Sequence, residues 1–117
     1  SMSATPVDTR RTVAARMVVD IDAEDIGPGC LMALTPREPG DPPPGYILTC
    51  PGCGQQSGLA LHPRDPHVPR WTVTAGDPSK AEGLTLSPSI HHQVTTHPLT
   101  TGCGWHGYLT NGVFRPC

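Results

Sequence analysis

The sequence contains few aromatic residues, few charged residues and no long hydrophobic run. Aromatic residues make up 4% of the 117 positions and charged residues 15%. No stretch approaches the roughly 18 consecutive apolar residues of a membrane-spanning helix, so we expect no membrane insertion. The net charge is only -2, and the eight Lys and Arg residues are spread thinly. Because nucleic-acid binding needs a basic patch, we expect no nucleic-acid partner.

Good helix-forming stretches are also missing. Glycine (13 residues) and proline (15 residues) together fill nearly a quarter of the chain, which excludes a helical bundle or a coiled coil. Large aliphatic residues and phenylalanine together make up just under about one-fifth of the chain, but the low net charge argues against disorder. We therefore expect a small folded domain whose thin core needs reinforcement by a metal or by disulfides.

Five cysteines are the candidates for that reinforcement. The N-terminus lacks the apolar segment of a secretory signal, so we expect a cytoplasmic protein with reduced thiols. Clustered cysteines in that compartment indicate metal ligands rather than disulfides. Cys30 stands alone in a short apolar run and is interpreted as a small buried hydrophobic residue.

Short apolar runs between glycines and prolines predict an all-β fold of about seven to nine short strands. A zinc-stabilised β domain is expected over residues 17–117, after a mobile N-terminal segment over residues 1–16. One helical turn is expected at residues 22–26, and long proline-rich loops at 36–45 and 63–69. The strands are expected at 17–21, 31–34, 46–49, 59–61, 71–75, 84–86, 107–110 and 113–115.

The C-terminus carries a strong β-hairpin signal. Asn111-Gly112 lies between two apolar-containing runs, as in a two-residue hairpin turn. The resulting register pairs Thr110 with Val113, Leu109 with Phe114 and Tyr108 with Arg115. Extending the register places His106 opposite Cys117, while Leu109 and Phe114 face the core.

The segment Cys50-Pro51-Gly52-Cys53-Gly54 has the form of a zinc knuckle, and Cys103 with His106 offers a second pair of ligands. Zinc requires four ligands on tetrahedral corners, and Cys117 is a further candidate. We favour a structural zinc held by Cys50, Cys53, Cys103 and Cys117, which would leave His106 free. The alternative is three thiolates with the His106 imidazole, and Cys117 as a frayed last residue.

A second unusual segment is Thr85-Leu86-Ser87-Pro88-Ser89-Ile90-His91-His92. A nucleophilic serine needs a neighbouring base, and three histidines could serve Ser87 or Ser89: His91, His92 and His106. Spacing alone does not choose among them. The plainer interpretation is a strand that ends in a Ser-Pro turn and is followed by exposed histidines.

The order of these motifs resembles a family of small bacterial proteins encoded in ubiquitination-like (Bub) operons. The resemblance covers roughly residues 17–117 and is carried by Cys50 to Gly54, Thr85 to Ile90, Gly102 to Cys103, and His106 to Gly112. The family usually has an aromatic residue where Gly107 stands here. The resemblance implies a serine peptidase that acts on a ubiquitin-like protein, with E1-like and E2-like proteins as operon partners.

Carried over by motif, the resemblance assigns the nucleophile to Ser89 and the base to His106. Asp77 is a candidate to orient His106, although a turn residue of Gly76-Asp77-Pro78 is the plainer interpretation. Two other functions stay open. One is a non-enzymatic zinc-ribbon adaptor that binds a protein partner, and the other is a zinc hydrolase with an open metal position.

Overall fold

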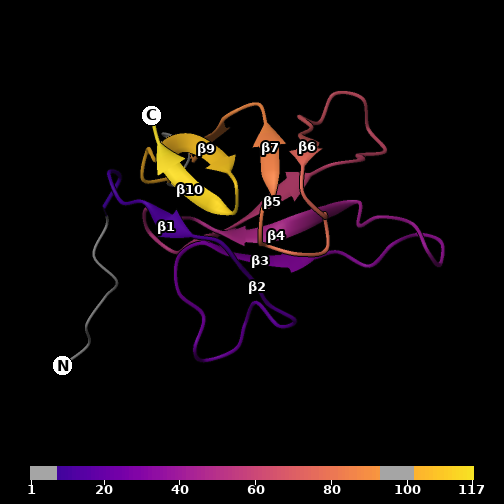
Figure 1. The fold of residues 1–117 in the computed structure, drawn as a ribbon, viewed down its shortest axis with the longest axis horizontal. Coiled ribbons are helices and arrows are strands. Elements are labelled where there is room, and N and C mark those ends of the chain that lie inside the picture. The colour runs from indigo at the N-terminus through magenta and orange to yellow at the C-terminus, as the bar shows by residue number, and fades with distance from the viewer. Residues whose placement is uncertain (1–7, 93–101) are drawn as a thin grey trace.

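The computed structural model describes residues 8–92 and 102–117, and within them it has strands but no helix. The all-β expectation is confirmed, with ten short strands instead of seven to nine (Figure 1). The strands are β1 (Val13–Ala14), β2 (Arg16–Met17), β3 (Cys30–Ala33), β4 (Gly45–Thr49), β5 (Gln56–Ala60), β6 (Thr72–Ala75), β7 (Thr85–Ser87), β8 (Ile90–His91), β9 (His106–Thr110) and β10 (Val113–Pro116).

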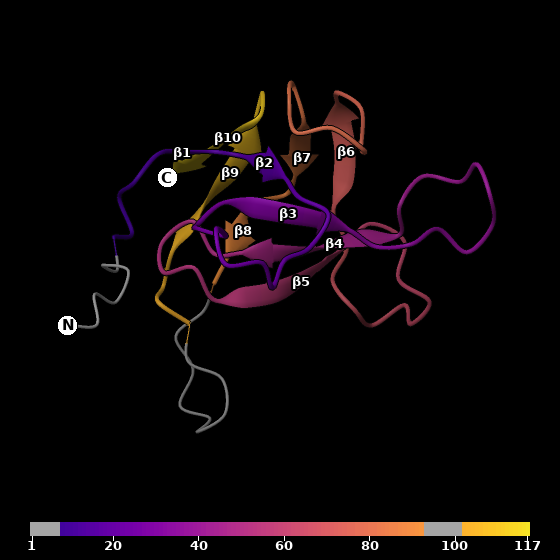
Figure 2. The same ribbon diagram turned by 90° about the horizontal axis from the view of Figure 1, so that it is seen from below.

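The strands form three small sheets. One has the order β1-β10-β9-β8, the second β2-β3-β4-β5, and the third pairs β6 with β7. Figure 2 shows the C-terminal hairpin of β9 and β10 beside β7, in agreement with the packing of β7 against β9. Among the described strands, β8 ends the first four-stranded sheet and β5 ends the second, and each pairs with a strand on one side only; on the other side of β5, the Ala60 carbonyl accepts from the Trp71 N–H at 2.8 Å.

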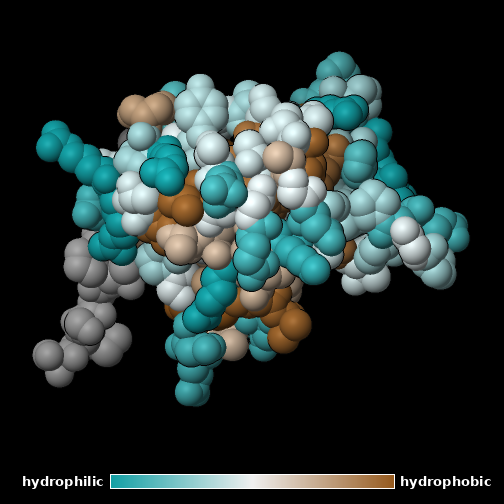
Figure 3. Space-filling view, in the orientation of Figure 1, coloured by the Kyte–Doolittle hydropathy of each residue, from teal (hydrophilic) through white to brown (hydrophobic). Residues whose placement is uncertain are grey.

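One core connects all three sheets, and it contains most of the few aromatic side chains. Tyr46, Trp105 and Phe114 are fully buried, and the rings of Trp105 and Phe114 meet edge to face at a centroid distance of 6.0 Å. Leucines from every sheet surround them. On the face seen in Figure 3, hydrophobic surface is confined to patches among polar residues. Three of the few aromatic side chains therefore contribute their large buried area to the core that the three sheets share.

The C-terminal hairpin has the predicted register. Thr110 pairs with Val113, Leu109 with Phe114 and Tyr108 with Arg115. Asn111 and Gly112 have φ values of 50° and 75°, as a type I′ turn requires. The pairing continues to the end of β10, where the Cys117 N–H donates to the His106 carbonyl at 3.0 Å.

The N-terminal part differs from the expectation. Residues 13–17, most of which were expected in a mobile segment, form β1 and β2, because β1 pairs with β10 and β2 with β3. The strand expected over 17–21 ends at Met17, and Asp20 accepts a hydrogen bond from the Asp22 N–H in a turn. The helical turn expected at 22–26 does not form. Residues 1–7 lie outside the described residues.

The described residues include no helix that is long and apolar enough to cross a membrane.

Gly107 directly follows His106, and its neighbours explain why no side chain fits there. A Cβ at this position would overlap the Arg115 carbonyl oxygen and come within 2.8 Å of the Trp105 ring. We expect Gly107→Ala to lower the free energy of unfolding by about 1–3 kcal/mol, as overpacked sites do. Urea unfolding followed by tryptophan fluorescence measures the change.

Gly58→Ala is the matched control, because a Cβ at Gly58 in β5 meets nothing within 4 Å. We expect its free energy of unfolding to change by less than about 0.5 kcal/mol. Equal destabilisation by the two substitutions would contradict the close packing at Gly107.

Candidate functional site

The pairing of β8 with β9 brings a serine to a histidine. Ile90 pairs with Gly107, and His91 pairs with His106. Ser89 immediately precedes β8, and its Oγ lies 2.9 Å from Nε2 of His106. Ser87 belongs to β7 and pairs with Thr72. Of the two candidate serines, Ser89 is therefore the one within hydrogen-bond reach of His106.

The His106 ring has partners on two further sides. Its Nδ1 lies 3.4 Å from Sγ of Cys117. The His91 ring lies against it with a centroid distance of 4.9 Å and a tilt of 40°. His106 and Cys117 are exposed, whereas Ser89 is half-buried. The arrangement is a serine and a histidine in contact at the surface, which is the geometry of an activated hydroxyl nucleophile.

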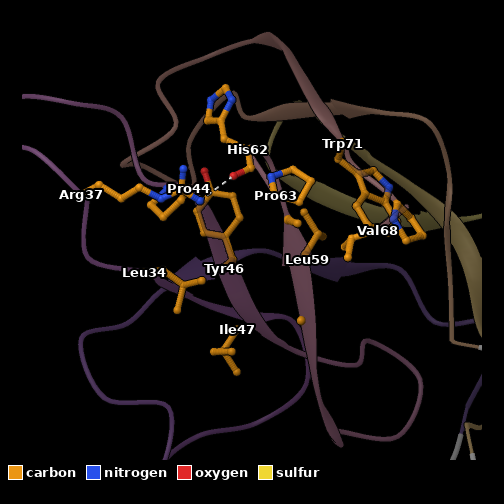
Figure 4. A pocket seen from close by; sticks show the side chains of 13 residues that line it. Leu34, Arg37, Pro44, Tyr46, Ile47, Leu59, His62, Pro63, Val68 and Trp71 are labelled. Carbon is orange, nitrogen blue, oxygen red and sulfur yellow. Dashed lines mark hydrogen bonds between the residues drawn. The ribbon is translucent and has the colours of Figure 1, made fainter. Parts of the chain in front are cut away.

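A tryptophan links Ser89 to a large apolar cavity. The Trp71 indole N–H donates to the Ser89 carbonyl oxygen at 3.2 Å. Trp71 also lines an apolar cavity of about 440 Å³ over β4 and β5. Figure 4 shows Trp71 and Val68 at one end of this cavity and Arg37 at the other, where its guanidinium donates to the His62 carbonyl. Trp71 therefore connects the backbone of Ser89 to this apolar cavity.

A second cluster lies close by and has the composition of a metal site. The ligand atoms of Cys50, Cys53, His92 and Cys103 all lie within 4.8 Å of one another. Cys50 Sγ lies 3.5 Å from Cys103 Sγ, and His92 Nδ1 lies 3.6 Å from Cys53 Sγ and 3.8 Å from Cys103 Sγ. A tetrahedron with Zn–S bonds of about 2.3 Å and a Zn–N bond of about 2.0 Å has edges of about 3.5–3.8 Å. Three sulfurs and one imidazole at these distances fit such an ion.

Burial affects the ionisation of two members of this cluster. It raises the pKa of the Cys50 thiol to about 12, assisted by the neighbouring Cys103 thiol and opposed by backbone hydrogen bonds from the knuckle. Burial also lowers the pKa of His92, and the adjacent His91 acts in the same direction. A neutral imidazole is the form that binds metals, whereas a buried thiolate needs a nearby cation. Metal binding and loss of the Cys50 proton are therefore coupled.

The fourth position of the cluster corrects a sequence prediction. We expected Cys117 beside Cys50, Cys53 and Cys103, but Cys117 lies against His106 and His92 takes the fourth position. The cause is the continuation of β8. The His92 N–H donates to the Trp105 carbonyl, and the Gly104 N–H donates to the His92 carbonyl, each at 2.8 Å. Since neighbouring residues of a strand point to opposite faces, His92 points away from His91 and toward the cysteines.

Within the described residues, the hydrogen bonds of the Asp77 carboxylate come from Ser79 and not from His106. That carboxylate accepts hydrogen bonds from the Ser79 N–H at 2.9 Å and the Ser79 hydroxyl at 2.7 Å, which lower the pKa of Asp77. Burial, and then the charge of Asp77, raise the pKa of Tyr46 to about 12, so Asp77 acts near Tyr46. The interpretation of Asp77 as a turn residue agrees with these contacts. Cys30 is buried, as expected.

Comparison with known families bears on what this arrangement does. The family model described as "Bacterial ubiquitination-like system serine protease (BubE)" matches residues 19–117. The chain belongs to the BubE family. The match spans the cysteine knuckle, Ser89, His106 and the C-terminal hairpin, and it confirms the resemblance noted in the sequence. No curated protein and no solved structure gives a significant match.

The BubE family description accounts for a serine and a histidine in contact. The family is described as a serine protease, and therefore a hydrolase, of a bacterial ubiquitination-like system. The sequence prediction missed His92 as a member of the cysteine cluster, whereas the hairpin register had already placed Cys117 opposite His106. Because side chains alternate along a strand, Ser89 and His91 share one face and His92 lies on the other. This pattern identifies His92 only once the partner strand is known.

The cysteine cluster predicts which histidine holds a metal. We expect purified protein to contain one tightly bound metal ion per chain and His92→Ala to lose most of it, because His92 supplies one of four ligand atoms. Inductively coupled plasma mass spectrometry measures the metal content. His91→Ala is the matched control, since the adjacent His91 faces His106, and Cys117→Ala is a second control. Retention of the metal by His92→Ala together with its loss from Cys117→Ala would contradict this ligand set.

Proposed function

We propose that this BubE-family chain is a peptidase that cleaves the C-terminal tail of a ubiquitin-like protein, with Ser89 as nucleophile and His106 as base. The contact of 2.9 Å between Ser89 Oγ and His106 Nε2 carries the proposal. The family's link to a bacterial ubiquitination-like system supports the substrate class. E1-like and E2-like proteins of such a system are the proposed operon partners.

The reaction proceeds by acyl transfer. Ser89 Oγ attacks the carbonyl carbon of the scissile bond while its proton moves to Nε2 of His106. The imidazolium then gives that proton to the leaving amine, the scissile C–N bond breaks, and the ubiquitin-like portion that ends at the scissile carbonyl remains on Ser89 as an ester. A water molecule attacks the ester carbonyl as His106 takes its proton; the C–Oγ bond breaks, the imidazolium returns the proton to Ser89 Oγ, and the carboxylate product leaves. Both half-reactions use the same serine-histidine contact.

The open sheet edges support recognition of an extended tail. β8 and β5 each end a four-stranded sheet. A depression of about 120 Å³ lies between them, and its lining includes Gly58 of β5 and both residues of β8. An extended peptide can add to such an edge through main-chain hydrogen bonds. A tail held there would run past Ser89, which immediately precedes β8.

A structural zinc ion completes the proposal. Cys50, Cys53, His92 and Cys103 would hold it in a closed tetrahedral site, and the ion would supply cross-linking, since four protein ligands leave no position for water. These ligands come from the knuckle after β4, the end of β8 and the segment before β9. The ion would thereby fix the two strands that carry Ser89 and His106. Cysteines must stay reduced to bind the ion, and the cytoplasm keeps thiols reduced. We therefore propose a cytoplasmic location.

Substitution of either serine tests the assignment of the nucleophile. We expect Ser89→Ala to slow cleavage of the cognate ubiquitin-like precursor by at least about 10⁴-fold, because the attacking oxygen is gone. Mass spectrometry of the precursor over time measures the rate, with folding and metal content checked in parallel. Ser87→Ala is the matched control, as Ser87 pairs with Thr72 in another sheet, and should cleave at the wild-type rate.

Two outcomes would contradict the proposal. Wild-type cleavage by Ser89→Ala would exclude Ser89 as the nucleophile. Tight binding of the ubiquitin-like protein without any turnover by the wild type would instead identify a non-enzymatic adaptor.

A further inference from the structure

Nε2 of His106 faces Ser89, and the other ring nitrogen, Nδ1, faces Cys117. The proposed reaction gives this second contact no role so far. Cys117 Sγ lies 3.4 Å from His106 Nδ1 and 3.6 Å from the His106 carbonyl oxygen. The Cys117 backbone is tied to the same residue, because its N–H donates to the His106 carbonyl at 3.0 Å. Although Cys117 is exposed, its sulfur is thus held beside one edge of the imidazole ring.

The chemistry of a general base explains why that edge matters. A neutral imidazole carries one N–H and one lone pair, and His106 can accept the Ser89 proton only if the lone pair is on Nε2. The proton must then be on Nδ1, and it needs an acceptor. A thiol that donated its own proton to Nδ1 would enforce the opposite tautomer. The sulfur must therefore accept for the ring to act as a base.

We propose that Cys117 is a positioning residue of the peptidase: its sulfur accepts the Nδ1–H of His106 and holds the base in the productive tautomer. The inference rests on the proposed function of Ser89 and His106. During acyl transfer a proton moves from Ser89 Oγ to His106 Nε2, while the Nδ1 proton stays in place. The sulfur forms no covalent bond and stabilises the imidazolium as its charge develops.

The surrounding residues leave this role to Cys117. His92 completes the cysteine cluster, so the Cys117 thiol is available. The carboxylate of Asp77, the residue expected to orient His106, accepts hydrogen bonds from Ser79. The His91 ring lies beside the His106 ring, with a centroid distance of 4.9 Å and an interplanar angle of 40°. Nδ1 of His106 lies within hydrogen-bond distance of the Cys117 sulfur, at 3.4 Å.

Substitutions of Cys117 separate positioning from structure. We expect Cys117→Ala to lower kcat by about 10- to 100-fold with little change in KM, since a charge-assisted hydrogen bond is lost from the transition state. Metal content and Tm should stay at wild-type values, because Cys117 is exposed and outside the cysteine cluster. Cys117→Asp should restore most of kcat, because a carboxylate is also an acceptor for Nδ1–H. Unchanged kcat in Cys117→Ala, or a Cys117→Asp variant as slow as Cys117→Ala, would overturn the proposal.

A second measurement needs no activity. Long-range ¹H–¹⁵N spectra of ¹⁵N-histidine-labelled protein in mildly alkaline buffer identify which nitrogen of His106 carries the proton. We expect the Nδ1–H tautomer in the wild type and in Cys117→Asp, and a shift toward Nε2–H in Cys117→Ala. An Nε2–H ring in the wild type would overturn the inference even in an active peptidase. The expected spectra from a protein that cleaves nothing would support the contact while the proposed function failed.

Discussion

The antiparallel pairing of β8 with β9 is the interaction on which both candidate sites depend. It places His91 opposite His106 and so brings Ser89, two residues earlier, within reach of the same ring. Because side chains alternate across a strand, His92 points to the other face and joins the three cysteines. A single register therefore creates a serine-histidine contact on one face and a metal-type cluster on the other.

This pairing is too short to hold itself. β8 has two residues, and the chain has few large apolar side chains to bury around it. Two local contacts compensate. The cluster joins the end of β8 to Cys50 and Cys103 in other segments, and the Trp71 indole donates to the Ser89 carbonyl. A thin core explains why a metal cross-link would be needed next to the reactive residues.

The parts that the sequence predicted well are those determined by neighbouring residues. The register of the C-terminal hairpin follows from Asn111-Gly112, and the knuckle follows from the spacing of Cys50 and Cys53. β1 and β8 were missed because two-residue strands exist only through pairing with distant partners. The exchange of Cys117 for His92 has the same cause, since no local pattern shows which residues face Cys103. Family resemblance, rather than spacing, separated Ser89 from Ser87.

The most direct test of the account is whether the reactivity of Ser89 depends on the metal across the strand. Fluorophosphonate labelling, mapped by peptide mass spectrometry, can be followed in metal-loaded protein, in chelator-stripped protein and after zinc is returned. The account predicts labelling of Ser89 in the loaded protein, its loss on stripping and its recovery with zinc. Labelling of Ser89 that is equally fast without metal, or labelling at Ser87 instead, would contradict it.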